Sequence, residues 1–115
     1  MFDFFKNAGA SAGHQNLMPD QFSEALRQPG RILLDVRRPE EFAKGHLPGA
    51  RNVEVTAPDF AHQIAALDKT ALIHVYCRSG ARSANAAEQL TRAGFAHVTN
   101  LLGGVLNWPE PLTTH

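Results

Sequence analysis

The sequence contains a single cysteine, Cys77, among 115 residues. One cysteine excludes an internal disulfide, a cysteine-rich zinc site and a second thiol in the chain that would resolve a disulfide on Cys77. A sulfur species formed on Cys77 would therefore need an external molecule to remove it. The six histidines are scattered, with no pair at the spacing of helical metal ligands, so we expect no metal site and no other cofactor.

The chain also lacks an excess of charge of either sign. Lysine and arginine together number 11, as do aspartate and glutamate, so the formal net charge is zero. We expect no binding to nucleic acid or to a membrane, and any attraction for anions must be local. Long apolar runs are absent, and residues 1–6 lack the basic start and apolar centre of a secretion signal. We therefore expect a cytoplasmic protein.

The composition suits one compact domain, with 43% hydrophobic residues. Residues 7–15 are mostly Ala, Gly and Ser, which offer little to pack. This pattern predicts a flexible arm over residues 1–15, a domain over residues 16–110 and a short tail over residues 111–115. Phe2 and Phe5 near the start would share a helical face, to which we assign no function.

Helical and extended segments alternate along the domain. Helices are expected to start at Pro19, at Pro39, near Pro58 and at Ser83, and strands to cover 32–34, 71–76 and 98–101. Strands that alternate with helices, without a hairpin signal, predict an α/β domain with a parallel sheet covered on both faces. In such sheets, ligands bind at the carboxyl ends of the strands.

Cys77 stands where the apolar run Ala71–Tyr76 meets a basic stretch. The run is typical of a buried parallel strand, so Cys77 should lie in the turn between a strand and a helix. Backbone N–H groups of such a turn form a concave nest, and the helix dipole, Arg78 and Arg82 add positive charge. Surroundings of this kind lower a cysteine pKa from ~8.5 to between about 3.5 and 7.5, which favours a thiolate.

Five segments, taken in order, resemble the successive motifs of rhodanese-like domains. They are LLDVR at 33–37, EF at 41–42, GHLPGARNV at 45–53, VYCRSGARS at 75–83 and GGVLNW at 103–108. The resemblance covers about 16–108 and implies a five-stranded parallel sheet flanked by helices, with the Cys77 loop as active site. Glu54 departs from the pattern, since the family often has proline there, and this bears on the local loop.

The length of the loop indicates the chemistry. Cys77 through Arg82 are six residues, the length typical of rhodanese-like sulfurtransferases, whereas the related cell-cycle phosphatases use one more. A tetrahedral phosphate needs a wider ring of donors, so the resemblance favours sulfur. It implies a sulfurtransferase that moves a sulfane sulfur from a small anion such as thiosulfate, through a persulfide on Cys77, to a thiol, cyanide or protein acceptor. The alternatives are a non-catalytic protein-binding module and a cysteine-dependent phosphatase or arsenate reductase.

The expected substrate-binding residues surround the cysteine. They are Arg78, Ser79, Gly80, Ala81 and Arg82, whose backbone N–H groups would stabilise an anionic persulfide. Both arginines are candidates to bind the donor or to remain solvated, and Arg82 has a further alternative, an inward ion pair with a carboxylate. The hypothesis requires the amides to face the sulfur and the thiol to be open to solvent.

Other residues are expected to support the loop. The resemblance suggests that Asp35, Arg37, Glu41 and His46 form a hydrogen-bonded frame, since buried charges persist only when paired. For Ser83 we favour a role in starting the helix over donation to the sulfur. We interpret Trp108 as a core anchor.

Overall fold

The computed structural model describes residues 13–115. Most of the predicted arm over residues 1–15, including the face shared by Phe2 and Phe5, lies outside the described residues. Gln15, which the prediction places in the arm, is the first residue of a strand and is buried. The edge of the sheet therefore begins inside the stretch that composition assigns to the arm.

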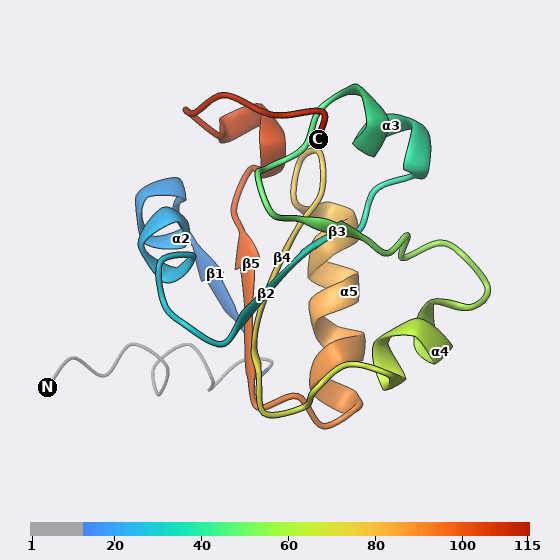
Figure 1. Cartoon of the computed structure of the whole chain (residues 1–115). Coiled ribbons are helices and arrows are strands. Elements are labelled where there is room, and N and C mark those ends of the chain that lie inside the picture. The colour runs from blue at the N-terminus through green and yellow to red at the C-terminus, as the bar shows by residue number, and fades with distance from the viewer. Residues whose placement is uncertain (1–12) are drawn as a thin grey trace, which may run out of the picture.

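Five parallel strands form one sheet in the order β1-β5-β4-β2-β3 (Figure 1). The strands are β1 (Gln15–Leu17), β2 (Arg31–Asp35), β3 (Arg51–Asn52), β4 (Leu72–Tyr76) and β5 (His97–Leu101). The predicted α/β class and five-stranded parallel sheet are confirmed. The sequence pattern located β2, β4 and β5, whereas β1 and β3, of three and two residues, are too short to show a periodicity.

Helices cover both faces of the sheet, as predicted (Figure 1). They are α2 (Pro19–Ala25), α3 (Pro39–Lys44), α4 (Phe60–Ala65), α5 (Ala81–Arg92) and the 3-10 helix η1 (Gly104–Asn107). Alternate residues of β4 point to opposite faces. Ile73 and Val75 join one hydrophobic cluster with α4 and α5, whereas Tyr76 joins a second with Phe22 of α2.

The observed helix starts refine the predicted ones. α2 and α3 begin at the expected prolines, where a fixed φ suits the first helical position. α4 begins at Phe60, two residues after the expected Pro58. α5 begins at Ala81, before the predicted Ser83, because Gly80 adopts a left-handed conformation with φ 108° and serves as the N-cap residue. This early start brings the first turn of α5 to the cysteine.

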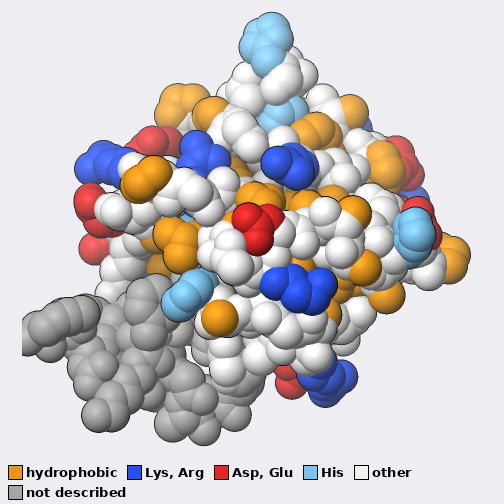
Figure 2. Space-filling model, turned by 60° about the horizontal axis from the view of Figure 1, so that its bottom comes forward, with side chains coloured by type: hydrophobic (Ala, Val, Ile, Leu, Met, Phe, Trp, Pro, Cys, Tyr) orange, Lys and Arg blue, Asp and Glu red, His pale blue; other side chains and the backbone are white. Residues whose placement is uncertain are grey.

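On the face shown in Figure 2, acidic and basic side chains do not form separate patches. In the view of Figure 2, the described part carries basic, acidic and hydrophobic side chains interspersed, in keeping with a net charge of zero. Within residues 13–115, no helix has the length and apolar character needed to cross a bilayer.

Candidate active site

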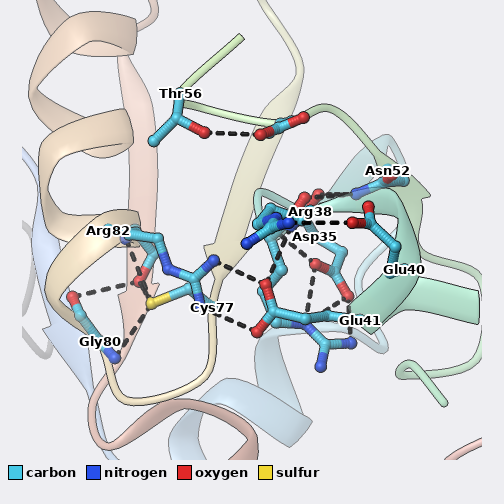
Figure 3. A network of polar contacts seen from close by, with 12 residues as sticks. Asp35, Arg38, Glu40, Glu41, Asn52, Thr56, Cys77, Gly80 and Arg82 are labelled. Atoms are coloured by element: carbon cyan, nitrogen blue, oxygen red, sulfur yellow. Dashed lines mark hydrogen bonds and ion pairs between the residues drawn. The ribbon is translucent and has the colours of Figure 1, made fainter. Parts of the chain in front are cut away.

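Cys77 directly follows β4 at the carboxyl edge of the sheet, and α5 begins four residues later. Because Gly80 adopts a left-handed conformation, the loop turns back and aims the Gly80 amide at the cysteine. That amide donates a hydrogen bond to Cys77 Sγ at 3.1 Å, as Figure 3 shows. The predicted turn between strand and helix is present, and its amide faces the sulfur.

A second group of donors comes from Ser83. Its amide lies 3.4 Å and its hydroxyl 3.3 Å from Cys77 Sγ. Burial alone would raise the pKa of the Cys77 thiol, but hydrogen bonds from the Ser83 hydroxyl and from the amides of Ser83, Gly80 and Ser79 outweigh it and lower that pKa. The lowering of the Cys77 pKa that the sequence predicts therefore arises from these hydrogen bonds rather than from the arginine charges that the sequence suggested.

The predicted role of Ser83 as the start of the helix is wrong. Ser83 is the third residue of α5, is fully buried, and directs its hydroxyl inward. Besides the sulfur, the Ser83 hydroxyl lies 2.5 Å from Oδ1 of Asn100 and 3.2 Å from the Gly80 carbonyl. Sequence reasoning missed Asn100, although a polar residue near the end of the buried strand β5 was an available signal.

Arg82 forms an ion pair with Glu41 of α3. Its guanidinium donates two hydrogen bonds to the Glu41 carboxylate, at 2.7 and 3.0 Å (Figure 3). The hydrogen bonds from Arg82 lower the pKa of Glu41 to about 2, and those to Glu41 raise the pKa of Arg82. Of the alternatives for Arg82, the structure has the inward ion pair, which ties α3 to the first turn of α5.

Asp35 and Arg37 form a buried ion pair at the end of β2. Arg37 Nη2 lies 2.6 Å from Oδ2 of Asp35, and the same nitrogen donates to the carbonyl of Gly45 at 2.7 Å. Burial would lower the pKa of Arg37, but the hydrogen bond and charge of Asp35 outweigh it and raise that pKa. Asn52 adds hydrogen bonds of 3.0 and 2.9 Å to the carbonyls of Asp35 and Arg37. The pair fixes the loop that leads into α3.

His46 connects the same loop region to the end of the chain. Its Nδ1 lies 2.9 Å from the Phe42 carbonyl and its Nε2 lies 3.0 Å from the His115 carbonyl. His46 also pairs with Thr113 through two backbone hydrogen bonds of 2.8 Å. The predicted tail, 111–115, therefore packs beside the frame residues.

The far side of the Cys77 loop rests on η1. The carbonyl of Cys77 accepts a hydrogen bond from Val105 at 3.0 Å, and the carbonyl of Arg78 accepts one from Leu106 at 3.1 Å. A Cβ on Gly104 would lie 2.5 Å from the Cys77 carbonyl oxygen, so only glycine allows this approach. The GGVLNW segment thus holds the Cys77 loop through these backbone hydrogen bonds. Trp108 is partly buried and packs against Phe22, consistent with a core anchor.

Access to the sulfur differs from the expectation. Cys77 is 1% exposed, so the thiol is not open to solvent as the hypothesis required. Arg78 and Ser79, by contrast, are exposed at the outer side of the loop. Within residues 13–115, the Arg78 side chain has no hydrogen bond or ion pair, so of the two arginines of the cysteine loop it is the one left available to an incoming anion.

The chain resembles known proteins over most of its length. The model of the Rhodanese-like domain family matches residues 18–110. The chain is 37% identical over 92 residues to thiosulfate sulfurtransferase GlpE of Stutzerimonas stutzeri, which covers 79% of this chain and 82% of that protein. It is 39% identical over 91 residues to thiosulfate sulfurtransferase 16, chloroplastic, of Arabidopsis thaliana, covering 70% of this chain and 76% of that protein.

The fold has a match among solved structures as well. A structure described as rhodanese with anions from E. coli superposes with a TM-score of 0.62 at 32% sequence identity. The superposition covers 74% of this chain and 99% of that one. The match of the family model, over residues 18–110, includes the segments that carried the resemblance in the sequence.

Proposed function

Since the chain belongs to the rhodanese-like domain family, we propose that it is a sulfurtransferase that carries sulfane sulfur as a persulfide on Cys77. The observation that carries the proposal is the position of Cys77 Sγ among the Gly80 amide and the amide and hydroxyl of Ser83, at 3.1 to 3.4 Å. Preorganised donors of this kind stabilise an anionic sulfur without a cost of reorganisation during the reaction.

The proposed reaction is a double displacement. The Cys77 thiolate attacks the outer sulfur of a thiosulfate-like donor, the bond between the two donor sulfurs breaks, and sulfite leaves with the bonding electrons. An external nucleophile then attacks the terminal sulfur of the persulfide and regenerates the thiolate. Because Cys77 is the only cysteine, that acceptor must come from outside the chain, as a thiol, cyanide or a protein.

Exposed Arg78 is the residue that we assign to the negative charge of the donor. Arg82 contributes mainly by shaping the loop, because Glu41 already occupies its guanidinium. This pairing also disfavours the phosphatase and arsenate reductase alternatives, in which an arginine at the far end of the loop must clasp a tetrahedral anion. The presence of Cys77 separates the proposal from a non-catalytic binding module.

The burial of Cys77 adds a requirement to the proposal. A donor must reach a sulfur whose residue is 1% exposed, so the mouth of the loop at Arg78 and Ser79 has to open. A reducing compartment such as the cytoplasm, where we place the reaction, keeps the thiol ready for this step.

The test is intact-mass analysis of the protein after exposure to thiosulfate, with Cys77→Ser as the matched control. We expect the native protein to gain one sulfur atom and the variant to gain none. Addition of cyanide should then remove the sulfur and release thiocyanate. A native protein that gains no sulfur from thiosulfate or from another sulfane donor would contradict the proposed function.

A further inference from the structure

The Ser83 hydroxyl lies near three acceptors, Asn100 Oδ1, Cys77 Sγ and the Gly80 carbonyl, but has one proton to donate. The Gly80 carbonyl already accepts a hydrogen bond from the Ala84 amide. Oδ1 of Asn100 lies 2.5 Å from Ser83 Oγ, and Cys77 Sγ lies 3.3 Å from it. Ser83 is fully buried and Asn100 is 2% exposed, so solvent does not supply a substitute donor to Asn100 or to the sulfur. Cys77 Sγ also accepts from the amides of Gly80 and Ser83, so the direction of the Ser83 O–H bond decides whether its proton goes to Asn100 or gives the sulfur a further hydrogen bond.

Asn100 is held in place by a second asparagine. Its Nδ2 donates a hydrogen bond of 3.1 Å to Oδ1 of Asn16, which directs the Asn100 carbonyl oxygen toward Ser83. Asn16 belongs to β1 and Asn100 to β5, and the two residues are direct partners in the parallel register. The edge of the sheet thus orients the amide next to the catalytic loop.

We propose that Asn100 is a positioning residue that holds the Ser83 hydroxyl proton while Cys77 is a thiol and yields it to Sγ when the sulfur is anionic. In the thiol state, Ser83 donates to Asn100 and its lone pair accepts from the Cys77 S–H group. In the anionic state the hydroxyl turns to the sulfur, because a hydrogen bond to a charged acceptor is stronger than one to a neutral amide. The proposal rests on the proposed function, which requires an anionic sulfur at this position.

Asn100 therefore opposes ionisation of the thiol, since the Ser83–Asn100 hydrogen bond must break when the proton turns to the sulfur. Removing the Asn100 acceptor should lower the pKa of Cys77, and removing the Ser83 hydroxyl should raise it. With the opposite orientation of the amide, Nδ2 of Asn100 would donate to Ser83, and removal of the Asn100 side chain should then raise the pKa of Cys77. The sign of the change thus distinguishes the two arrangements.

The charged groups near Cys77 do not alter the expected direction of the change in the Cys77 pKa when Asn100 is replaced. Arg82 in α5 is paired with Glu41 in α3, and Asp35 after β2 is paired with Arg37. Arg78 on the loop is exposed and interacts through solvent. None of these groups forms a hydrogen bond with Asn100, so a neutral substitution at Asn100 leaves the surrounding charges unchanged.

The test is a pH titration of the thiolate by its ultraviolet absorbance in the full chain, with Cys77→Ser as the blank. The single cysteine makes the signal unambiguous, and burial raises the pKa of Tyr76, the one tyrosine, so its ionisation does not interfere. This readout needs no access to the sulfur and no sulfur donor. A failure to load sulfur from thiosulfate would therefore count against the proposed function and not against the role of Asn100.

Asn100→Leu and Asn100→Val both remove the acceptor, and valine also suits a strand. We expect each to lower the titration midpoint by about half to one pH unit, a three- to tenfold change in the ionisation constant. Ser83→Ala should raise the midpoint, and Asn100→Leu should have no further effect in that background. Asn16→Gln, which is neutral and keeps an acceptor for Asn100, serves as the control and should shift the midpoint less. A raised midpoint in both Asn100 variants, or a shift that persists without the Ser83 hydroxyl, would overturn the proposal.

Discussion

The Glu41 carboxylate accepts two hydrogen bonds from the Arg82 guanidinium, at 2.7 and 3.0 Å, although the residues are 41 positions apart. Glu41 belongs to α3 and Arg82 to the first turn of α5, so the pair joins two loops at the carboxyl edge of the sheet. Their side chains are 28% and 31% exposed, which shields the pair from solvent in part. The pair fixes Arg82 at the end of the cysteine loop.

Glu41→Gln should weaken this connection. Glutamine keeps a carbonyl oxygen for the Arg38 amide but loses the charge that attracts Arg82, and we expect a loss of about 1 kcal/mol in the free energy of unfolding. Urea denaturation measures this change. The control is Glu40→Gln, which breaks the exposed pair with Arg38 and should change the stability much less. Equal effects of both substitutions would show that the Glu41–Arg82 pair is no more than a surface contact.

The same pair predicts a pH dependence of stability. The pKa of Glu41 is lowered from an ordinary value of 4.5 to about 2, so its contribution is fully present above about pH 4.5. The contribution should decline as the pH falls from 4.5 through 2, because the folded protein resists protonation more than the unfolded chain. Urea denaturation of native protein and Glu41→Gln across this range should show the two stabilities converging at low pH. A constant difference between them would contradict the lowered pKa of Glu41.

Gly80→Ala should impair the loop. Gly80 has φ 108°, where an L side chain is strained, and we expect a stability cost of about 1 to 3 kcal/mol together with slower sulfur loading, because the amide on Cys77 Sγ shifts. Gly30→Ala is the matched control. Gly30 also has a positive φ, 75°, with no atom near a Cβ, so it shares the strain but lies outside the cysteine loop. The comparison uses loading rates from time-resolved intact mass, and similar slowing in both variants would count against a specific role for Gly80.

Arg78→Ala should weaken donor binding without loss of stability. Arg78 is exposed and unpaired within the described residues, so its removal breaks no internal contact. We expect loading from dilute thiosulfate to slow several-fold, with less effect at saturating donor, because the charge acts on the incoming anion. The control is Arg92→Ala, an exposed arginine at the end of α5 whose side chain is 76% exposed. Added salt should reduce the difference between native protein and Arg78→Ala, and an unchanged difference would argue against an electrostatic role.

Local patterns predicted the parts of the fold that are long enough to carry a signal. The apolar run before Cys77 became β4, and the prolines at 19 and 39 became helix starts, because strand burial and helix initiation depend on near neighbours in sequence. The two-residue β3 and the edge strand β1 have no such signal. Their pairing is set by neighbouring strands, and only the family resemblance implied them.

In the candidate active site, too, some features follow from local sequence and others only from tertiary contacts. The sequence identified Cys77, the glycine that turns the loop and the set of frame residues, since each belongs to a contiguous motif. It favoured donor binding for Arg82 over solvation and left an ion pair open, because the partner, Glu41, lies in another element. It placed Ser83 wrongly and missed Asn100, because the start of α5 depends on how Gly80 turns over η1 and because β5 approaches the loop only in the folded sheet.

By itself, then, the sequence determined the class of fold and the position of the cysteine that we propose as the reacting residue, since both follow from short-range patterns of burial, turn geometry and residue chemistry. The tertiary structure alone decided which donors reach the sulfur, which cation stays available and how deeply the thiol lies. Those properties depend on distances between segments that are remote in the chain, and such distances are fixed only when the sheet and its helices pack together.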